Sequence, residues 1–184
     1  LIAARPDRED ILIGAVAPSV KGHECEKRAI LLVLVGGEGM VRADGTWQRG
    51  EIHVLLVGDP GTCKSMLLTF VSTIWPGAAY GSGSGTSKAG LTAAAVKDEV
   101  TGEWMLEAGI VPQAQGSAGC LDEIEKMQQQ DVTALTIAME QGVIPVDKAT
   151  IHARIPAKTS VLAAANPKFG RFDRYLSTSQ QVTD

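Results

Sequence analysis

The chain has 184 residues, of which 45% are hydrophobic and 21% charged, and its formal net charge at pH 7 is −4. This length and apolar content suffice for one globular domain, and the negative charge excludes a protein that coats nucleic acid by bulk electrostatics, so any DNA contact must be local. No apolar run approaches the roughly 20 residues of a membrane-spanning helix, and we expect no membrane partner.

The three cysteines are widely separated and form no C-x-x-C pair, which predicts neither a disulfide framework nor a zinc site. The first ten residues lack the basic, apolar and small-residue order of a signal peptide. A reducing, intracellular setting is therefore predicted. Because the chain begins with Leu1 rather than Met, we expect a fragment of something longer.

The first half of the chain predicts a helix, a loop, a strand and a second helix. The pattern favours a helix over His23–Val35 that ends at Gly36, followed by a loop to Gly50. Glu51–Val57 is a short apolar run typical of a strand, and Lys64–Trp75 resumes a helical pattern. The glycine-rich turn between strand and helix is where a ligand site is expected.

A glycine- and serine-rich segment follows, and then the first of two predicted hairpins. Gly81–Gly90 has the composition of a flexible linker, but its place between structured segments indicates an internal loop. Leu91–Lys97 and Glu103–Glu107 flank Asp98–Gly102, an arrangement that predicts a β-hairpin with glycine in its turn.

The remaining elements alternate between strand and helix. We predict a buried strand over Ser117–Leu121, a helix over Gln128–Gln141, a second hairpin over Val143–Ile155 and a core strand over Thr159–Ala165. Such alternation favours an α/β fold with a parallel sheet flanked by helices and two hairpin inserts. In sheets of this kind ligands bind beyond the carboxyl ends of the strands.

The segment GDPGTCKS, residues 58–65, resembles a phosphate-binding loop. The strict pattern fails, because Gly61 lies three residues before Lys64 rather than immediately before it. A strand nevertheless feeds a Gly/Pro loop whose amides can surround phosphate, and Lys64 opens a helix whose N-terminus favours anions. Ser65 is then placed to bind magnesium. The alternative is a strand-to-helix turn with an incidental Lys-Ser pair.

Two adjacent acids follow the second predicted strand, and an amide follows the third. A magnesium-dependent ATPase needs one carboxylate near the metal, which suits Asp122, and another to polarise the attacking water, which suits Glu123. Asn166 would emerge at the same sheet edge, where its amide could orient water. Taken singly, Asp-Glu is also a common helix start and Asn-Pro a common turn.

Five strings in one order carry a specific resemblance: GDPGTCKS, AGLTAAAVKDEVTGEWMLEAG, LDEIEKM, AMEQ and AAANPKFGR. From about Ala17 to Arg171 the chain resembles the AAA+ P-loop core of the MCM (minichromosome maintenance) replicative DNA helicases, in an archaeal-like form. The resemblance implies ATP and Mg²⁺ as cofactors, a hexamer of MCM subunits and DNA as partners, and a location in the cytoplasm or nucleoid of an archaeon or the nucleus of a eukaryote.

The resemblance also assigns roles to individual residues. It makes Lys64 the Walker A lysine that binds the β- and γ-phosphates, Ser65 and Asp122 the magnesium ligands, Glu123 the catalytic acid of Walker B, and Asn166 sensor 1. Lys148 lies in what resembles the pre-sensor-1 hairpin, whose lysine meets the DNA backbone in the ring channel. The nucleotide-binding residues it implies are Gly58, Asp59, Pro60, Gly61, Thr62, Cys63, Lys64, Ser65 and Met66, with Val20, Lys21 and Gly22 beside the adenine.

The chain departs from the family pattern at several positions. Cys63 replaces an alanine, Met66 a glutamine and Lys21 an aromatic residue, and none of these changes removes a catalytic group. Pro156 and Lys158 stand where Asn and Arg are typical, and lysine lacks the bidentate fork of arginine. The final segment STSQQVTD replaces the continuation toward the arginine finger and the helical lid with sensor 2. We therefore expect residues 1–184 to be an AAA+ core without its lid, inactive or weakly active alone.

Three functions remain open on these observations. The first is a motor subunit, or its core, that couples ATP hydrolysis to DNA unwinding. The second is a hydrolysis-deficient paralogue or truncated remnant that binds nucleotide and docks on a partner. The third is an AAA+ transcription activator or magnesium-chelatase subunit, which shares the hairpin-bearing core but should not contain AMEQ and AAANPKFGR.

Overall fold

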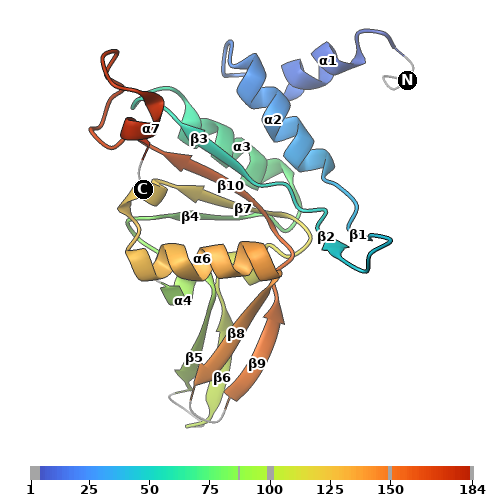
Figure 1. Cartoon of the computed structure of the whole chain (residues 1–184), viewed down its shortest axis with the longest axis vertical. Coiled ribbons are helices and arrows are strands. Elements are labelled where there is room, and N and C mark those ends of the chain that lie inside the picture. The colour runs from blue at the N-terminus through green and yellow to red at the C-terminus, as the bar shows by residue number, and fades with distance from the viewer. Residues whose placement is uncertain (1–4, 87, 99–101, 149–150, 183–184) are drawn as a thin grey trace.

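A four-stranded parallel sheet forms the centre of the molecule (Figure 1). The computed structural model describes residues 5–86, 88–98, 102–148 and 151–182. In spatial order the strands are β3 (Val54–Val57), β10 (Ser160–Ala165), β7 (Ala118–Asp122) and β4 (Ala79–Ser82). The two central strands, β10 and β7, are buried along their whole length, as expected for parallel strands covered on both faces.

Alternate residues of the central strand point into two separate cores. Leu162 and Ala164 pack on one face, where α2 (Glu24–Val35) and α3 (Lys64–Ile74) supply Ile30, Leu67 and Leu68. Val161 and Ala163 pack on the other face, against Leu135 and Ala138 of α6 (Gln129–Gln141). Figure 1 shows α2 and α3 on one side of the sheet and α6 on the other. This three-layer arrangement confirms the predicted α/β class.

The central position of β10 joins distant parts of the chain. Leu162 pairs with Val54 of β3 on one side and with Cys120 of β7 on the other. Next to this ladder the Val161 N–H donates a 3.1 Å hydrogen bond to Nδ1 of His53, 108 residues earlier in the sequence. Strands β3 and β7 precede the phosphate-loop candidate and the acidic pair, and in the described sheet both pair with β10, which lies between them.

Both predicted hairpins are present, and they project together from one end of the molecule (Figure 1). The first pairs β5 (Ala93–Lys97) with β6 (Trp104–Ala108), and the second pairs β8 (Val143–Lys148) with β9 (Ile151–Pro156). Gly102 adopts a φ of +72°, the conformation that favours glycine in a turn. Residues 99–101 and 149–150, the remainder of the two turns, lie outside the described residues.

Several short elements differ from the sequence prediction. The stretch before Gly50, predicted as a loop, contains a small hairpin of β1 (Met40–Val41) and β2 (Trp47–Gln48), whose turn is stabilised by a 2.9 Å hydrogen bond from the Thr46 N–H to Asp44 Oδ1. The predicted loop from Gly81 was wrong at its start, because β4 extends to Ser82. The helices that we did not predict are α1 (Arg8–Ala15), α4 (Lys88–Leu91), α5 (Ile110–Gln113), α7 (Thr178–Gln181) and a 3₁₀ turn, η2 (Ile124–Lys126).

The boundaries of the predicted elements are otherwise close to those observed. The strand predicted from Glu51 begins at Val54, and α2 ends before Gly36, whose φ of 68° is combined with an extended ψ of 178° rather than a left-handed helical one. Among the helices in the described part of the chain, none is long and apolar enough to span a bilayer.

Candidate phosphate-binding site

Three loops meet at the carboxyl edge of the sheet. One follows β3 and begins at Gly58, one follows β7 at Asp122, and one follows β10 at Asn166. The strands are parallel, so these ends lie at the same edge, and a 3.3 Å hydrogen bond from the Gly58 N–H to the Ala165 carbonyl joins the first loop to the third. The sheet thus brings together residues that are more than 100 positions apart in the sequence.

The loop between β3 and α3 reverses direction through two residues of positive φ. Gly61 has a φ of 81°, which its missing side chain permits, and Cys63 has a φ of 62° in the left-handed region. The Thr62 hydroxyl donates a 2.8 Å hydrogen bond back to the Asp59 carbonyl. A left-handed cysteine costs on the order of 1 kcal/mol, which indicates that the loop and the start of α3 hold it in place.

Lys64, the first residue of α3, folds back over its own loop. Its ammonium donates to the carbonyl oxygens of Gly58 and Asp59 at 2.6 and 2.8 Å. The side chain is half-buried, so the charge is partly removed from water and is balanced by carbonyl oxygens. An ammonium in this position can exchange those carbonyls for the oxygens of an anion at the helix N-terminus.

A cavity of about 380 Å³ opens beside this loop. It is lined by Pro60, Gly61, Thr62, Cys63, Lys64, Ser65, Met66, Asp122, Glu123 and Asn166. Every lining residue belongs to the set predicted from the sequence. The two predicted loop residues missing from the lining, Gly58 and Asp59, instead supply the carbonyls that hold the Lys64 ammonium.

Asp122 is rigidly fixed at the end of β7. The residue is 8% exposed, Oδ1 accepts the Glu123 N–H at 2.9 Å, and Oδ2 accepts the Tyr80 hydroxyl at 3.0 Å. Desolvation of the phenol, together with the hydrogen bond to Asp122, raises the pKa of Tyr80 to about 12. Tyr80 therefore stays a proton donor at neutral pH, and its hydrogen bond orients the Asp122 side chain.

Glu123 reaches the same cavity from a left-handed backbone position, with a φ of 53°. Its Oε1 accepts a 2.6 Å hydrogen bond from the Lys126 ammonium, three residues later, and this contact lowers the pKa of Glu123. The hydroxyls of Ser82 and Ser84 approach Oε2 at 3.4 Å, which is long for a hydrogen bond. Glu123 is thus charged at neutral pH and turned toward a neighbouring cation.

Asn166 links the cavity to the turn that follows β7. Its amide Nδ2 donates a 2.7 Å hydrogen bond to Oε1 of Glu125. A second connection crosses the loops, because the Phe172 N–H donates at 2.8 Å to Oδ1 of Asp59. The segment after β10 therefore contacts both the phosphate-loop candidate and the acidic turn.

Ser65 and Asp122 both line this cavity and both have side-chain oxygen, the ligand type that Mg²⁺ prefers. In the described part of the chain, no three His, Cys, Asp or Glu side chains gather into a protein-only metal cage. One carboxylate and one hydroxyl beside a phosphate loop suit a cation that keeps waters and binds through phosphate. The two predicted ligands therefore fit magnesium.

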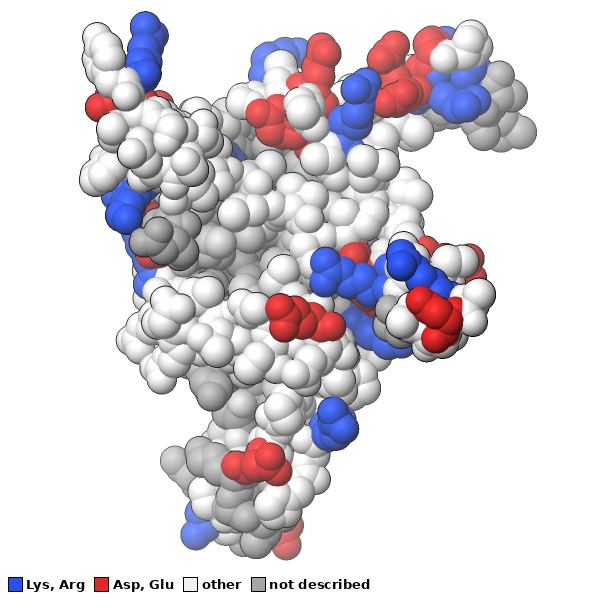
Figure 2. Space-filling view, viewed as in Figure 1, with Lys and Arg blue, Asp and Glu red and all other residues white. Residues whose placement is uncertain are grey.

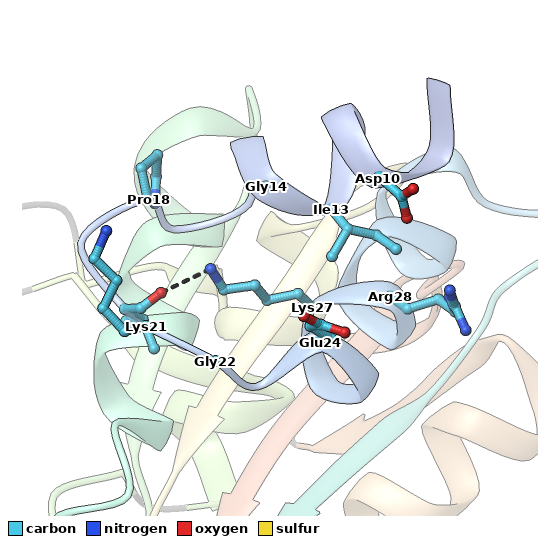
Figure 3. A pocket seen from close by; sticks show the side chains of 10 residues that line it. Asp10, Ile13, Gly14, Pro18, Lys21, Gly22, Glu24, Lys27 and Arg28 are labelled. Atoms are coloured by element: carbon cyan, nitrogen blue, oxygen red, sulfur yellow. Dashed lines mark hydrogen bonds between the residues drawn. The ribbon is translucent and has the colours of Figure 1, made fainter. Parts of the chain in front are cut away.

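The three residues predicted beside the adenine line a different hollow (Figure 3). Val20, Lys21 and Gly22 border a cavity of about 340 Å³ between α1 and α2. Lys27 of α2 is 6% exposed, and its ammonium donates a 2.7 Å hydrogen bond to the Val20 carbonyl, drawn as a dashed line in Figure 3. Val20 is itself buried in the core against which Cys63 packs. Their contact with a base stays a prediction.

Lys148 is the last residue of β8, pairs with Ile151 across the second hairpin and is not among the residues that line the cavity beside Lys64. Figure 2 shows no broad patch of Lys and Arg on this face of the molecule, since few charges lie over its middle and both signs occur near the hairpin end. A nucleic-acid contact at Lys148 would have to be local. That role, too, stays a prediction.

Sequence reasoning missed three residues that hold the site together. Tyr80 fixes Asp122, Glu125 fixes Asn166, and Lys126 binds Glu123. The spacing of Glu123 and Lys126 was a usable signal, because residues three apart meet on a helical turn. No comparable signal marked Tyr80, whose partner is 42 positions away.

Comparison with known proteins agrees with the geometry. The family model described as the MCM P-loop domain matches residues 1–183. The chain is 46% identical over 171 residues to the minichromosome maintenance protein MCM of Saccharolobus solfataricus, covering 93% of this chain and 25% of that protein. It is 44% identical over 181 residues to the DNA replication licensing factor Mcm3 of Drosophila melanogaster, covering 98% and 22% respectively.

A third relative, the DNA replication licensing factor mcm5 of Dictyostelium discoideum, is 45% identical over 173 residues, which cover 94% of this chain and 23% of that protein. The chain thus spans about a quarter of the length of these relatives or slightly less.

Proposed function

Since the chain belongs to the MCM family, we propose that it is the ATP-binding core of a hexameric replicative helicase and that it binds MgATP in the cavity beside Lys64. One observation carries the proposal: a phosphate loop, two acids and an amide from three separate strands line a single cavity at the carboxyl edge of the sheet. Two of these relatives are named DNA replication licensing factors, which supports the wider role.

Phosphate binding follows from the loop geometry. The ammonium of Lys64 would leave the carbonyls of Gly58 and Asp59 and bind phosphate oxygens, which carry more negative charge than a carbonyl. The N-terminus of α3 adds free N–H groups and the positive end of the helix dipole. The loop carbonyls would thus serve as the resting partners of Lys64.

The other residues that line the cavity would bind magnesium and activate water. Ser65 and Asp122 would hold the magnesium ion, which supplies charge neutralisation at the phosphates when bound. Glu123 would accept a proton from the attacking water, and Asn166 would orient that water. Because Lys126 already holds Glu123, the base must turn from its ion pair toward the water.

We predict that Lys126→Met shifts the acidic limb of the pH–rate profile of ATP hydrolysis to higher pH. The hydrogen bond from Lys126 lowers the pKa of Glu123, so the wild-type base stays ionised to lower pH than it would without that bond. Steady-state phosphate release between pH 4.5 and about 8 would measure the limb. The matched control is Lys97→Met on the exposed end of β5, and superimposable profiles for Lys126→Met and wild type would contradict the prediction.

The second hairpin would contact DNA through Lys148, and repetition around a ring would form a basic collar. We predict that Lys148→Ala weakens binding of DNA without changing ATP affinity, and that the slope of log affinity against log salt falls by about one. Fluorescence anisotropy of labelled DNA over a salt series would measure both. An unchanged isotherm would show that the lysine meets no phosphate.

The direct test of the proposed function is a titration of the chain with a fluorescent ATP analogue, with and without Mg²⁺. We expect saturable binding that unlabelled ATP displaces and that Mg²⁺ strengthens, because Ser65 and Asp122 lie beside the loop. Absence of binding under both conditions would refute the assignment of the cavity.

A further inference from the structure

The acidic residue that follows the Walker B pair has no role in the proposed function, although its contact is well defined. Glu125 lies in the middle of η2, its Oε1 accepts the Asn166 amide at 2.7 Å, and its Oε2 is buried with no hydrogen-bond partner among the described residues. Asn166 lines the cavity with Glu123, whereas Glu125 does not. The carboxylate therefore reaches the cavity only through the amide.

We propose that Glu125 is a positioning residue that fixes which atom of the Asn166 amide faces the attacking water, an inference that rests on the proposed function. Oε1 of Glu125 accepts the hydrogen bond from Asn166, so this contact selects the donor Nδ2 of the amide over the acceptor Oδ1. Nδ2 and Oδ1 are both bonded to Cγ of Asn166 and point in different directions. With Nδ2 held by Glu125, the acceptor Oδ1 is the atom left to meet a ligand in the cavity.

This orientation matters because of what a water nucleophile can donate. A water molecule has two protons, and a lone pair must point at phosphorus. Glu123 and Oδ1 of Asn166 would each accept one of those protons, which aims the lone pair away from both acceptors. A flipped amide would present N–H groups to the water and compete for the lone pair instead.

A purely structural role for Glu125 makes a different prediction from a positioning role. If Glu125 only stabilises the turn, its loss lowers the unfolding temperature and affects every ligand alike. If it positions Asn166, its loss changes the binding of analogues of the transferring phosphoryl group and leaves the binding of ADP unchanged. The informative quantity is the ratio of the affinity for MgADP with fluoroaluminate to that for MgADP.

The test measures this ratio by calorimetry for wild type, Glu125→Leu, Asn166→Ala and the double variant, with unfolding temperatures recorded for each. We expect either single substitution to lower the ratio about tenfold, the worth of one hydrogen bond of roughly 1.4 kcal/mol, at constant ADP affinity. Since both act through one contact, the double variant should lose no more than either single one. Glu38→Gln, an exposed acid outside the site, is the control.

A reciprocal exchange provides a second test that does not depend on the folding of Glu125→Leu. Asn166→Asp alone places two carboxylates together. It should abolish the increase in MgADP affinity that fluoroaluminate produces. Adding Glu125→Gln supplies an amide that donates to the new carboxylate, and we expect at least about a threefold recovery. A chain whose ratio responds to Asn166→Ala but neither to Glu125→Leu nor to this rescue would overturn the positioning role.

The outcomes separate this inference from the proposed function. Equal ADP affinity in wild type and Lys64→Ala would refute the nucleotide site itself. A different result would refute only the positioning role. In that result ADP binding depends on Lys64, but the double variant Glu125→Leu/Asn166→Ala lowers the affinity ratio by the product of the two single effects. A wild type that gains nothing from fluoroaluminate would refute it as well, because Asn166 would then have no water to orient.

Discussion

Replacing Glu123 by glutamine is expected to lower ATP hydrolysis by roughly 100- to 10,000-fold, the usual contribution of a general base. Glutamine keeps the size of the side chain but cannot accept the proton of the attacking water. Nucleotide affinity should stay close to wild type, since in the proposed function Lys64 and the loop amides, not Glu123, would meet the phosphates. Phosphate release at saturating MgATP measures the first quantity, and displacement of a fluorescent analogue measures the second.

One result would change the interpretation of Glu123. Turnover in Glu123→Gln equal to that of the Glu38→Gln control, with measurable turnover in the wild type, would remove Glu123 from the reaction. A wild-type chain that binds MgATP but releases no phosphate is the outcome expected of an AAA+ core without its lid, so it does not by itself favour a paralogue that binds nucleotide without hydrolysing it.

Lys64→Ala is expected to weaken binding of ATP by about 10- to 150-fold. A hydrogen bond to a charged group contributes roughly 1.5–3 kcal/mol, and an ammonium against phosphate is such a contact. The fold should persist, because Lys64 Nζ contacts only loop carbonyls and a hydroxyl. A titration with the fluorescent ATP analogue gives the affinity, and the unfolding temperature of the variant checks the fold.

The matched control for Lys64→Ala is Lys97→Ala, which removes an exposed lysine from the first hairpin. Its ATP affinity should equal that of wild type. If the two variants bind ATP equally well, the loop after β3 does not hold the phosphates, and the cavity loses its central assignment.

The sequence predicted the sheet edge because its signals were local. An apolar run followed by GDPGTCKS, and another followed by Asp122 and Glu123, each mark a strand and the loop beyond it within a few residues. The structure places these loops around one cavity, as the parallel-sheet hypothesis required. The family assignment from the same strings was confirmed by the match over residues 1–183.

The rest of the site depends on contacts between distant residues, which no local pattern marks. Strand β4 was missed because AYGS is short and contains glycine, and with it the hydrogen bond from Tyr80 to Asp122 was missed. The bond between Asn166 and Glu125 spans 41 positions. The β1–β2 hairpin, in contrast, has a local signal that the loop prediction did not use, because Asp44-Gly45 is typical of a hairpin turn.

The insertion of β10 between β3 and β7 has a consequence for how the chain folds. Neither β3 nor β7 can complete its pairing until β10, more than 100 residues downstream of β3, has arrived. Closing so long a loop costs entropy before any contact compensates for it. The hairpins and helices can form early from local contacts. The loop of Lys64 and the acids after β7 would come together only in the last stage. A chain still on the ribosome, whose β10 has not yet emerged, would therefore contain the residues of both loops but would not yet have formed the cavity.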